Sequence, residues 1–261
     1  MDNQDLTARY RAGLDVVREA GAFALDYYRR RASLSIERKG LQDFVSVADK
    51  ETEELIVGKL SKLFPDDSFL GEEGGIRQKG PLLWVIDPID GTANFLRGID
   101  HWCVSVGLIA DGKAVIGFLY NPVSGEMFSA FAGGGAFLDG ERIKVSGATD
   151  LAASNLGMGY AHRLPLAPYV RDMEASLRAG CDCRTLGSGA LDLAFVAVGR
   201  LDATWYQHIN LWDVAAGLAI VAEAGGMASD FMAGNPIRDG NALLVATPAL
   251  FEPLRRMFER D

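Results

Sequence analysis

The sequence contains little cysteine, little proline and no long hydrophobic run. Among 261 residues there are nine prolines and three cysteines, Cys103, Cys181 and Cys183. An odd number of cysteines, with few other soft ligands nearby, argues against a disulfide framework or a zinc site and favours free thiols in a reducing compartment. The longest apolar stretch, residues 211–224, is interrupted by two acidic residues and is too short to span a bilayer. The N-terminal segment carries both charge signs and no apolar core, so we expect neither a secretory signal nor a membrane anchor, and a cytoplasmic location.

The sequence also lacks any run of lysine and arginine. It contains 26 Lys and Arg against 35 Asp and Glu, a formal net charge of −9. Because nucleic-acid affinity comes mainly from neutralised phosphates, we expect no nucleic-acid partner. With 49% hydrophobic and 23% charged residues, the chain can bury enough apolar surface to fold. An acidic protein of this kind needs bound cations if it is to hold a phosphate.

Hydrophobic spacing predicts two N-terminal helices, over residues 6–31 and about 48–64. Short apolar runs separated by Asp-Gly and Ser-Gly turns then predict an antiparallel meander over residues 102–145. The remaining sequence alternates between helical and strand patterns. We therefore expect an N-terminal α+β half at residues 1–147, a C-terminal α/β half at residues 148–261, and one active-site cleft shared by both halves.

A pair of acidic residues follows the most apolar predicted strand. In residues 84–95 (WVIDPIDGTANF) the strand ends at Asp87, and Asp90 follows three positions later. Pro88 has no N–H group, so we expect the chain to leave the sheet there, whereas Gly91 and Thr92 allow the backbone to approach a ligand. Two adjacent carboxylates repel each other unless one protonates or a cation lies between them. A divalent cation with oxygen ligands, such as Mg²⁺, is the favoured interpretation over a simple capped turn.

Two further acidic sites are candidates for the same cluster. Glu72, in the glycine-rich segment GEEGG, follows a predicted strand, and Asp213 stands near the start of a predicted helix. Each has an ordinary structural explanation as well. Glu72 fits a solvated turn, and for Asp213 alone the capping of its helix is the stronger interpretation.

Four segments resemble signatures of the inositol monophosphatase family. Residues 84–95 are similar to its first signature and residues 211–226 (LWDVAAGLAIVAEAGG) to its second, while GEEGG and residues 43–49 (DFVSVAD) match two shorter motifs. The matches run in order through nearly the whole chain. The resemblance implies a layered αβαβα sandwich, of α+β or α/β class, like that of fructose-1,6-bisphosphatase. It also implies a Mg²⁺-dependent, Li⁺-sensitive phosphatase that uses direct attack by metal-activated water and forms a homodimer.

The resemblance further implies roles for individual residues and two to three Mg²⁺ ions in the active site. The implied metal ligands are Glu72, Asp87, the backbone carbonyl of Ile89, Asp90 and Asp213. The implied catalytic residues are Glu72, Asp49 and Thr92, with Lys39 as an auxiliary residue near the third ion. The implied substrate-binding residues are Asp90, Gly91, Thr92, Gly189, Tyr206 and Asp213.

The sequence departs from the family pattern at two of these positions. Family members that act on inositol phosphates carry a glutamate seven residues before the aspartate of the second signature, where this chain has Tyr206. Gly189 replaces the usual alanine of a G-(S/T)-A-A segment, and we expect it to add room. Tyr206, Gln207, His208 and Asn210 form a polar stretch that fits either a substrate pocket or a partly exposed strand end.

The leading hypothesis is therefore hydrolysis of a small polyol or amino-alcohol phosphate, such as an inositol 1-phosphate. A histidinol-phosphate, sugar or nucleotide phosphatase of the same family remains an alternative. A phosphatase that forms an aspartyl-phosphate is disfavoured, because its two aspartates lie two positions apart and not three. From outside the enzymes, a regulatory protein that uses the carboxylates only to bind a metal or an anion also fits the sequence.

Overall fold

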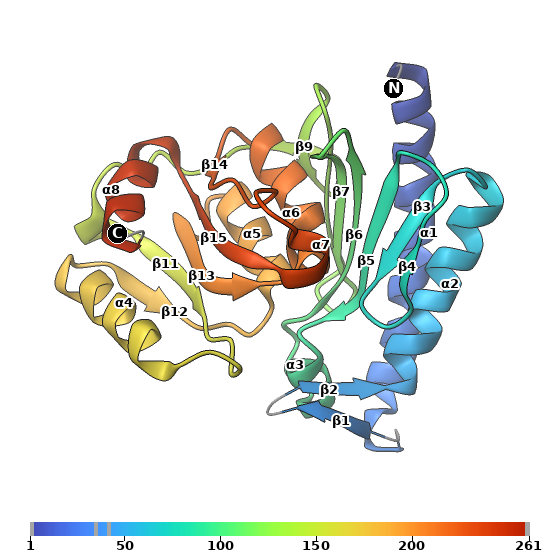
Figure 1. Ribbon diagram of the computed structural model, residues 1–261, viewed down its shortest axis with the longest axis horizontal. Helices are drawn as coiled ribbons and strands as arrows, with labels where there is room; N and C mark the ends of the chain where they lie inside the picture. Colours follow the sequence, from blue (N-terminus) through green and yellow to red (C-terminus); the bar gives the residue numbers. More distant parts are fainter. Residues whose placement is uncertain (1–2, 34–35, 41–42, 259–261) are drawn as a thin grey trace.

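The chain folds into five alternating layers of helices and sheets (Figure 1). The computed structural model describes residues 3–33, 36–40 and 43–258, with the backbone alone for Asn3 and for the described part of residues 33–45. From one outer layer to the other, the main helices are α1 (Asn3–Arg29) and α2 (Val47–Leu63), then α5 (Gly189–Ala197) and α6 (Leu211–Glu223), then α4 (Leu166–Arg178) and α8 (Pro248–Phe258). The two sheets lie between these helix layers, so the expected αβαβα sandwich of α+β class is confirmed.

The larger sheet has eight strands in the order β10-β9-β8-β7-β6-β5-β3-β4. Their bounds in chain order are β3 (Ser68–Gly71), β4 (Gly75–Arg77), β5 (Leu83–Asp90), β6 (Cys103–Ala110), β7 (Lys113–Asn121), β8 (Glu126–Phe131), β9 (Gly135–Leu138) and β10 (Glu141–Ile143). Strands β6 to β10 pair only with their neighbours in sequence and antiparallel, which confirms the predicted meander. Strand β3 is parallel to β5, so both strands direct their carboxyl ends to the same edge.

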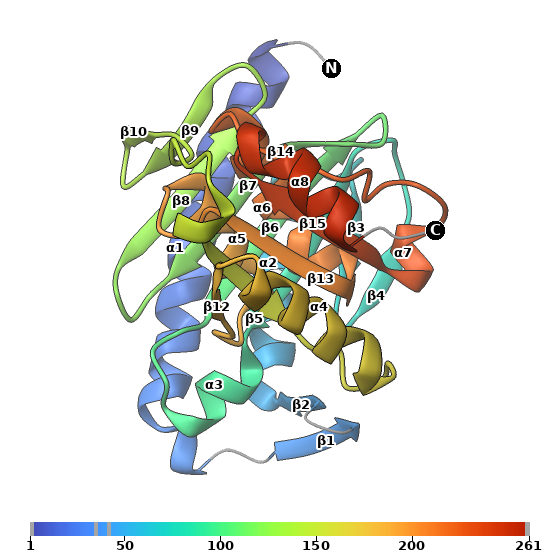
Figure 2. The ribbon, with the colours of Figure 1, turned by 90° about the vertical axis from the view of Figure 1, so that its left-hand side faces the viewer.

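The smaller sheet has five strands in the order β12-β11-β13-β15-β14. Their bounds are β11 (Asn155–Gly159), β12 (Asp182–Arg184), β13 (Ala203–Ile209), β14 (Met227–Ala228) and β15 (Asn241–Ala246). Strand β11 is parallel to β12 and β13, whereas β15 is antiparallel to β13 and β14. Helices α4 and α8 cover its outer face (Figure 2). The C-terminal part is therefore a mixed sheet.

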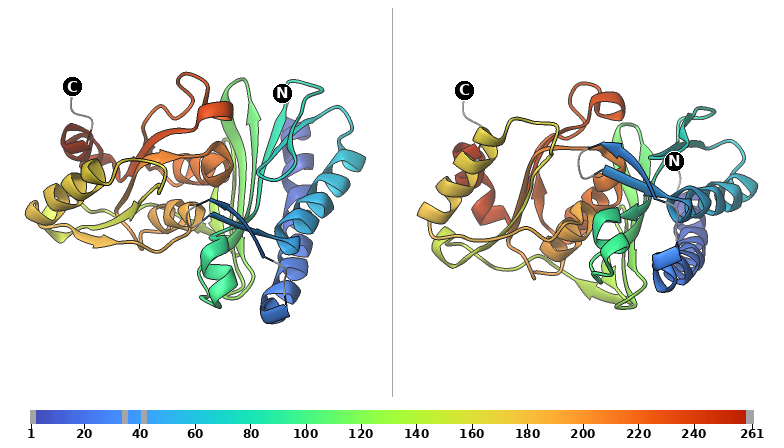
Figure 3. Two further views of the ribbon diagram at one scale, coloured as in Figure 1. Left: turned by 60° about the horizontal axis from the view of Figure 1, so that its bottom comes forward. Right: turned by 90° about the horizontal axis from the view of Figure 1, so that it is seen from below.

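Sequence patterns missed the shortest elements, namely the hairpin of β1 (Ile36–Gly40) and β2 (Asp43–Ser46), α3 (Thr92–Arg97), α7 (Pro236–Asp239), β4 and β14. Each is too short to show a periodicity. The hairpin lies beside α3 at one end of the molecule (Figure 3). The division at residues 147 and 148 stays a prediction. Among the helices of the described residues, none is both long and apolar enough to cross a membrane.

The central helix α6 lies unusually close to the larger sheet because two strands present glycines to it. A Cβ atom at Gly117 of β7 would lie 2.1 Å from the carbonyl oxygen of Ala216, and one at Gly107 of β6 would lie 2.8 Å from the Ala215 backbone. Ala215 and Ala216 are themselves small and fully buried. Small residues on both sides thus bring the start of α6, which carries Asp213, down onto the strands.

We expect the substitution Gly117→Ala to lower the free energy of unfolding by roughly 1–3 kcal/mol, because the added methyl group overpacks a backbone contact. Urea unfolding measures the change. The matched control is Gly58→Ala in α2, where a Cβ atom meets nothing within 4 Å and should be neutral or slightly stabilising. Equal stability of the two variants would contradict the close packing of α6.

Candidate active site

A β-bulge in β5 brings Asp87 and Asp90 to the same face of the sheet. Asp87 pairs with Ser105 and Asp90 with Cys103, so Pro88 and Ile89 together oppose the single residue Val104. Side chains three positions apart in a regular strand point to opposite faces, and one extra residue restores a common face. The expectation that the chain leaves the sheet at Pro88 is therefore wrong. Proline fits here because a bulge needs no ladder hydrogen bond from it.

Asp213 completes a group of three carboxylates. One oxygen atom from each of Asp87, Asp90 and Asp213 can be chosen so that all lie within 4.8 Å of one another. Asp213 also accepts a hydrogen bond from the backbone N–H of Asn210 at 2.9 Å, as the third residue of a capping box at the start of α6. The two interpretations of Asp213 are thus compatible: capping by one oxygen holds the side chain while the carboxylate faces its neighbours.

Glu72 lies beside this group at the end of β3. The backbone N–H of Glu72 donates to the carbonyl of Ile86 in the adjacent parallel strand at 3.1 Å, and its side chain lines the same cleft as Asp90 and Asp213. The charge of Glu72 contributes to raising the pKa of Asp87. Glu72 is therefore close to the cluster without belonging to the compact group of three.

Glu53, which the sequence analysis did not identify, supports the loop that carries Glu72. Its buried carboxylate accepts the backbone N–H groups of Glu73 at 2.9 Å and Gly74 at 2.7 Å. A Cβ atom at Gly71 or Gly74 would lie 2.2–2.5 Å from this carboxylate, so glycine is needed on both sides of the two glutamates. Glu53 lies one helical turn after Asp49 on α2, and that spacing is the sequence signal that points to it.

Asp49 and Thr92, two of the implied catalytic residues, lie close together. The Thr92 hydroxyl lies 3.4 Å from Asp49 Oδ1 and donates to the Ile89 carbonyl at 2.9 Å. The other oxygen of Asp49 accepts the hydroxyl and the backbone N–H of Ser46, which form the N-terminal cap of α2. The cap therefore fixes a buried carboxylate next to the first turn of α3.

Asp90 is held by the N-terminus of α5. Its Oδ2 atom accepts the hydroxyl of Ser188, the N-cap residue, and the backbone N–H of Ala190 at 2.9 Å. A helix N-terminus favours a nearby negative charge. These bonds lower the pKa of Asp90, but burial outweighs them and the pKa is raised to about 6. The contact joins the bulge of the larger sheet to the layer of central helices.

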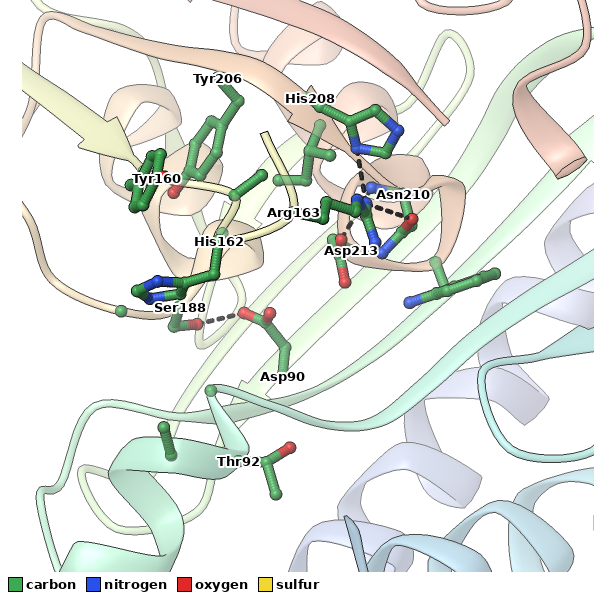
Figure 4. A pocket seen from close by; sticks show the side chains of 18 of the residues that line it. Asp90, Thr92, Tyr160, His162, Arg163, Ser188, Tyr206, His208, Asn210 and Asp213 are labelled. Atoms are coloured by element: carbon green, nitrogen blue, oxygen red, sulfur yellow. Dashed lines mark hydrogen bonds between the residues drawn. The ribbon is translucent and has the colours of Figure 1, made fainter. Parts of the chain in front are cut away.

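Glu72, Asp90 and Asp213 line a cleft of about 670 Å³. Strand alternation in β13 directs Tyr206 and His208 toward it, and Asn210 follows at the start of α6 (Figure 4). Gln207 points elsewhere and donates to Asp172 at 2.7 Å. These three residues thus line a pocket, and the prediction that it binds a substrate stays a prediction. Gly91 and Thr92 line the opposite side.

The Tyr206 hydroxyl is engaged within the protein, and Gly189 does not add room to the pocket. The Tyr206 hydroxyl donates to Asp192 Oδ2 of α5 at 2.6 Å, while Asp192 Oδ1 is buried without a partner among the described residues. A Cβ atom at Gly189 would lie 2.7 Å from Ile209 Cδ1. The expected extra room at Gly189 is therefore wrong, because the Ile209 side chain already fills that space.

The electrostatics of the cluster fit a hard cation. Burial raises the pKa of Asp87 well above its ordinary value, and the charges of Glu72, Asp90 and Asp213 raise it further. Burial and the charge of Asp90 also raise the pKa of Asp213 to about 7. Carboxylates arranged in this way are relieved by a divalent cation, and the available donors are all oxygen atoms. The residues present therefore match the metal that the resemblance implies.

Three further residues, Lys39, Arg97 and Cys103, are not among the clustered carboxylates. The side chain of Lys39 lies outside the described residues. Arg97 is exposed and donates to the carbonyl of Ala93 at 3.1 Å. Cys103 is a free thiol, and burial raises its pKa well above the ordinary value, which disfavours a reactive thiolate.

Comparisons with known proteins place this geometry in one family. The model of the inositol monophosphatase family matches residues 5–258. The "Nus factor SuhB" of Xylella fastidiosa is 39% identical over 82% of this chain and 78% of its own length. The "fructose-1,6-bisphosphatase/inositol-1-monophosphatase" of Thermotoga maritima is 41% identical over 76% of this chain and 75% of its own. The crystal structure of the extragenic suppressor protein suhB from Bartonella henselae superposes with a TM-score of 0.91, at 33% identity, over 97% of this chain and 99% of that one.

We expect the stability of the metal-free protein to depend on pH because of Asp192. Burial raises its pKa to about 7, so the folded chain retains a proton that the unfolded chain releases near pH 4. Stability is then present at low pH and falls as the pH rises toward 7. Between pH 5 and pH 8 this group accounts for a loss of roughly 2–3 kcal/mol. Urea unfolding in EDTA should show a shallower loss for Asp192→Asn, and parallel pH profiles would exclude this account.

We expect the substitution Glu53→Ala to weaken Mg²⁺ binding, although Glu53 is not a proposed metal ligand. Replacement by alanine leaves the N–H groups of Glu73 and Gly74 without their carboxylate and frees the Glu72 loop, so we expect the dissociation constant for Mg²⁺ to rise about 10- to 100-fold. Titration calorimetry measures the change. Glu54→Ala, on the exposed face of the same helix, is the control and should bind Mg²⁺ normally. Unchanged affinity in Glu53→Ala would show that the loop carrying Glu72 keeps its conformation without Glu53.

Proposed function

Because the chain belongs to the inositol monophosphatase family and is thus a phosphoric monoester hydrolase, we propose that it is a Mg²⁺-dependent phosphatase of small phosphorylated alcohols. The proposed substrates are polyol or amino-alcohol phosphates, including inositol 1-phosphate, histidinol phosphate and sugar phosphates. The observation that carries the proposal is the convergence of Asp87, Asp90 and Asp213 at the base of a cleft. This arrangement supports a phosphate site that depends on cations.

The proposed metal ligands are the three clustered aspartates, Glu72 and the backbone carbonyl of Ile89, around two to three Mg²⁺ ions. When bound, Mg²⁺ would neutralise the phosphate and stabilise the charge that develops on the leaving oxygen. The Ile89 carbonyl already accepts the Thr92 hydroxyl, but a carbonyl oxygen has a second lone pair for a cation.

The proposed role of Thr92 is to orient the attacking water. Its hydroxyl is held between Asp49 and the Ile89 carbonyl, which leaves a lone pair on the oxygen to accept a hydrogen bond from water. Glu72, on the neighbouring strand end, is the proposed acceptor of the proton. The N–H groups of Gly91 and Thr92 are proposed to bind phosphate oxygens, and Asp90, Asp213, Gly189 and Tyr206 to line the alcohol side. Lys39 stays a proposed auxiliary residue.

Several finer properties accompany this proposal. From its membership of the family we propose that the protein is inhibited by lithium, forms a homodimer and is located in the cytoplasm. A regulatory protein that binds metal or anions without turnover is the second candidate. The specific observation that favours this second candidate is that the Xylella fastidiosa relative is named a Nus factor. Turnover in a purified protein decides between the two.

The test is release of inorganic phosphate from a panel of phosphomonoesters, with Mg²⁺, with EDTA and with Li⁺. We expect Mg²⁺-dependent turnover, and Asp90→Asn should lower kcat/KM by about two orders of magnitude or more, because it removes a charge from the metal site without removing volume. Asp15→Asn, an exposed substitution on α1, is the control. Inactivity of the wild-type chain on every ester would instead favour the regulatory protein.

A further inference from the structure

One wall of the cleft contains a cation that the proposed reaction does not use. Arg163 lies in the loop between β11 and α4, exposed at the mouth of the cleft (Figure 4). Among the described residues that line the cleft, it is the one with a permanent positive charge. Its charge lowers the pKa of Asp213, which places it on the Asp213 side of the cluster. Nothing in the sequence pattern pointed to this residue.

The guanidinium of Arg163 is oriented by two neutral acceptors. Its Nη2 atom lies 2.6 Å from His208 Nδ1 and donates to Asn210 Oδ1 at 3.0 Å. His208 Nε2 donates to the carbonyl of Asp239 at 2.7 Å, so the neutral imidazole has its Nδ1 lone pair free to accept from Arg163. Within the described residues Arg163 forms no ion pair, and its Nε and Nη1 atoms make no hydrogen bond. The charge is held in place but not neutralised by a salt bridge.

The loop that carries Arg163 is itself well held. The hydroxyl of Tyr160 donates to the carbonyl of Leu164 at 2.8 Å, and the backbone N–H of Leu164 donates to the carbonyl of Ala161 at 2.8 Å. The Tyr160 ring also packs against Tyr169 of α4, with ring centroids 5.1 Å apart. These contacts close the loop on itself. Together with the bonds from Arg163 to His208 and Asn210, they hold the loop against the wall of the cleft.

The position that could bind a polyol is occupied differently. The Tyr206 hydroxyl donates its hydrogen bond to Asp192. At this position the cleft therefore presents an aromatic ring and has no carboxylate that could accept hydrogen bonds from sugar hydroxyls. This observation is independent of Arg163, but both favour the same kind of ligand. The wall offers little to a neutral polyol and an oriented guanidinium to an anion.

We propose that Arg163, oriented by His208 and Asn210, binds a second anionic group on the alcohol portion of the substrate. The preferred substrates are then phosphate esters whose alcohol carries a carboxylate or a further phosphate. This rests on the proposed phosphatase function and narrows it. The N–H groups on Nε and Nη1 of Arg163 are available to donate charge-assisted hydrogen bonds to the oxygen atoms of either group.

Two pairs of substrates, each differing by one anionic group, test the proposal. The first pair is glycerol 2-phosphate and 2-phosphoglycerate, and the second is fructose 1-phosphate and fructose 1,6-bisphosphate. We expect the wild-type kcat/KM to be at least about tenfold higher for the more anionic member of at least one pair, since one charge-assisted contact contributes about that factor. The pair that shows the preference distinguishes a carboxylate from a phosphate as the group bound.

The variant Arg163→Gln should abolish this ratio, mainly through a higher KM for the more anionic member, and Arg163→Lys should keep part of it. Arg178→Gln, an exposed substitution on α4, is the control and should keep the full ratio. Urea unfolding checks that the variants remain folded. A purely structural role of Arg163 would affect both members of a pair equally and leave their ratio intact, which would overturn the proposal.

The remaining outcomes separate this proposal from the proposed function. If the wild-type chain hydrolyses both members of each pair equally well, the phosphatase function stands and the second-anion site is wrong. If no ester is hydrolysed, the phosphatase function fails. Calorimetric binding of 2-phosphoglycerate against glycerol 2-phosphate, in wild type and Arg163→Gln, then decides the anion site: loss of a preference in the variant supports it, and equal binding overturns it.

Discussion

The site depends on the mutual repulsion of carboxylates that the fold forces together. Asp87 and Asp90 belong to one strand, and only the bulge at Pro88 and Ile89 gives both side chains the same face. Burial then makes each charge costly, and Asp213 adds a third within 4.8 Å. Alone, such an arrangement retains protons at neutral pH. A divalent cation converts the same arrangement from a cost into a binding site, so the stability of the folded chain and the chemistry of the cleft are linked through one equilibrium.

Hydrogen bonds from backbone N–H groups hold these carboxylates in place. Asp49 and Asp213 each take part in the N-terminal cap of their own helix, Asp90 accepts hydrogen bonds at the start of α5, and Glu53 accepts two N–H groups of the Glu72 loop. In Asp90 and Asp213 these bonds are made to one carboxylate oxygen, Oδ2, and the other oxygen is left available. A carboxylate anchored in this way loses little further freedom when it binds a cation, which favours binding without a separate folding step.

Much of the fold and of the cluster could be predicted from the sequence, because both depend on local patterns. Helical spacing, turn residues and the WVIDPIDGTANF segment all act over a few positions, and the long helices and the meander were found from them. The bulge was not, because Pro88 is compatible both with leaving a strand and with a bulge, and only the pairing of Asp90 with Cys103 distinguishes these. Asp192 and Arg163 gave no usable signal, since their partners lie 14 and 45 positions away in sequence.

Asp192 shows how a residue outside the cleft can influence it. Its carboxylate binds the Tyr206 hydroxyl, and its pKa is raised first by burial and then by the charge of Asp90. The coupling is reciprocal, because an ionised Asp192 makes a negative charge on Asp90 less favourable. A cation held by Asp90, as proposed, would reduce that repulsion, would favour ionisation of Asp192 and would strengthen its acceptance of the Tyr206 hydroxyl. The Tyr206 ring, which lines the cleft, would then be held most firmly in the proposed metal-bound state.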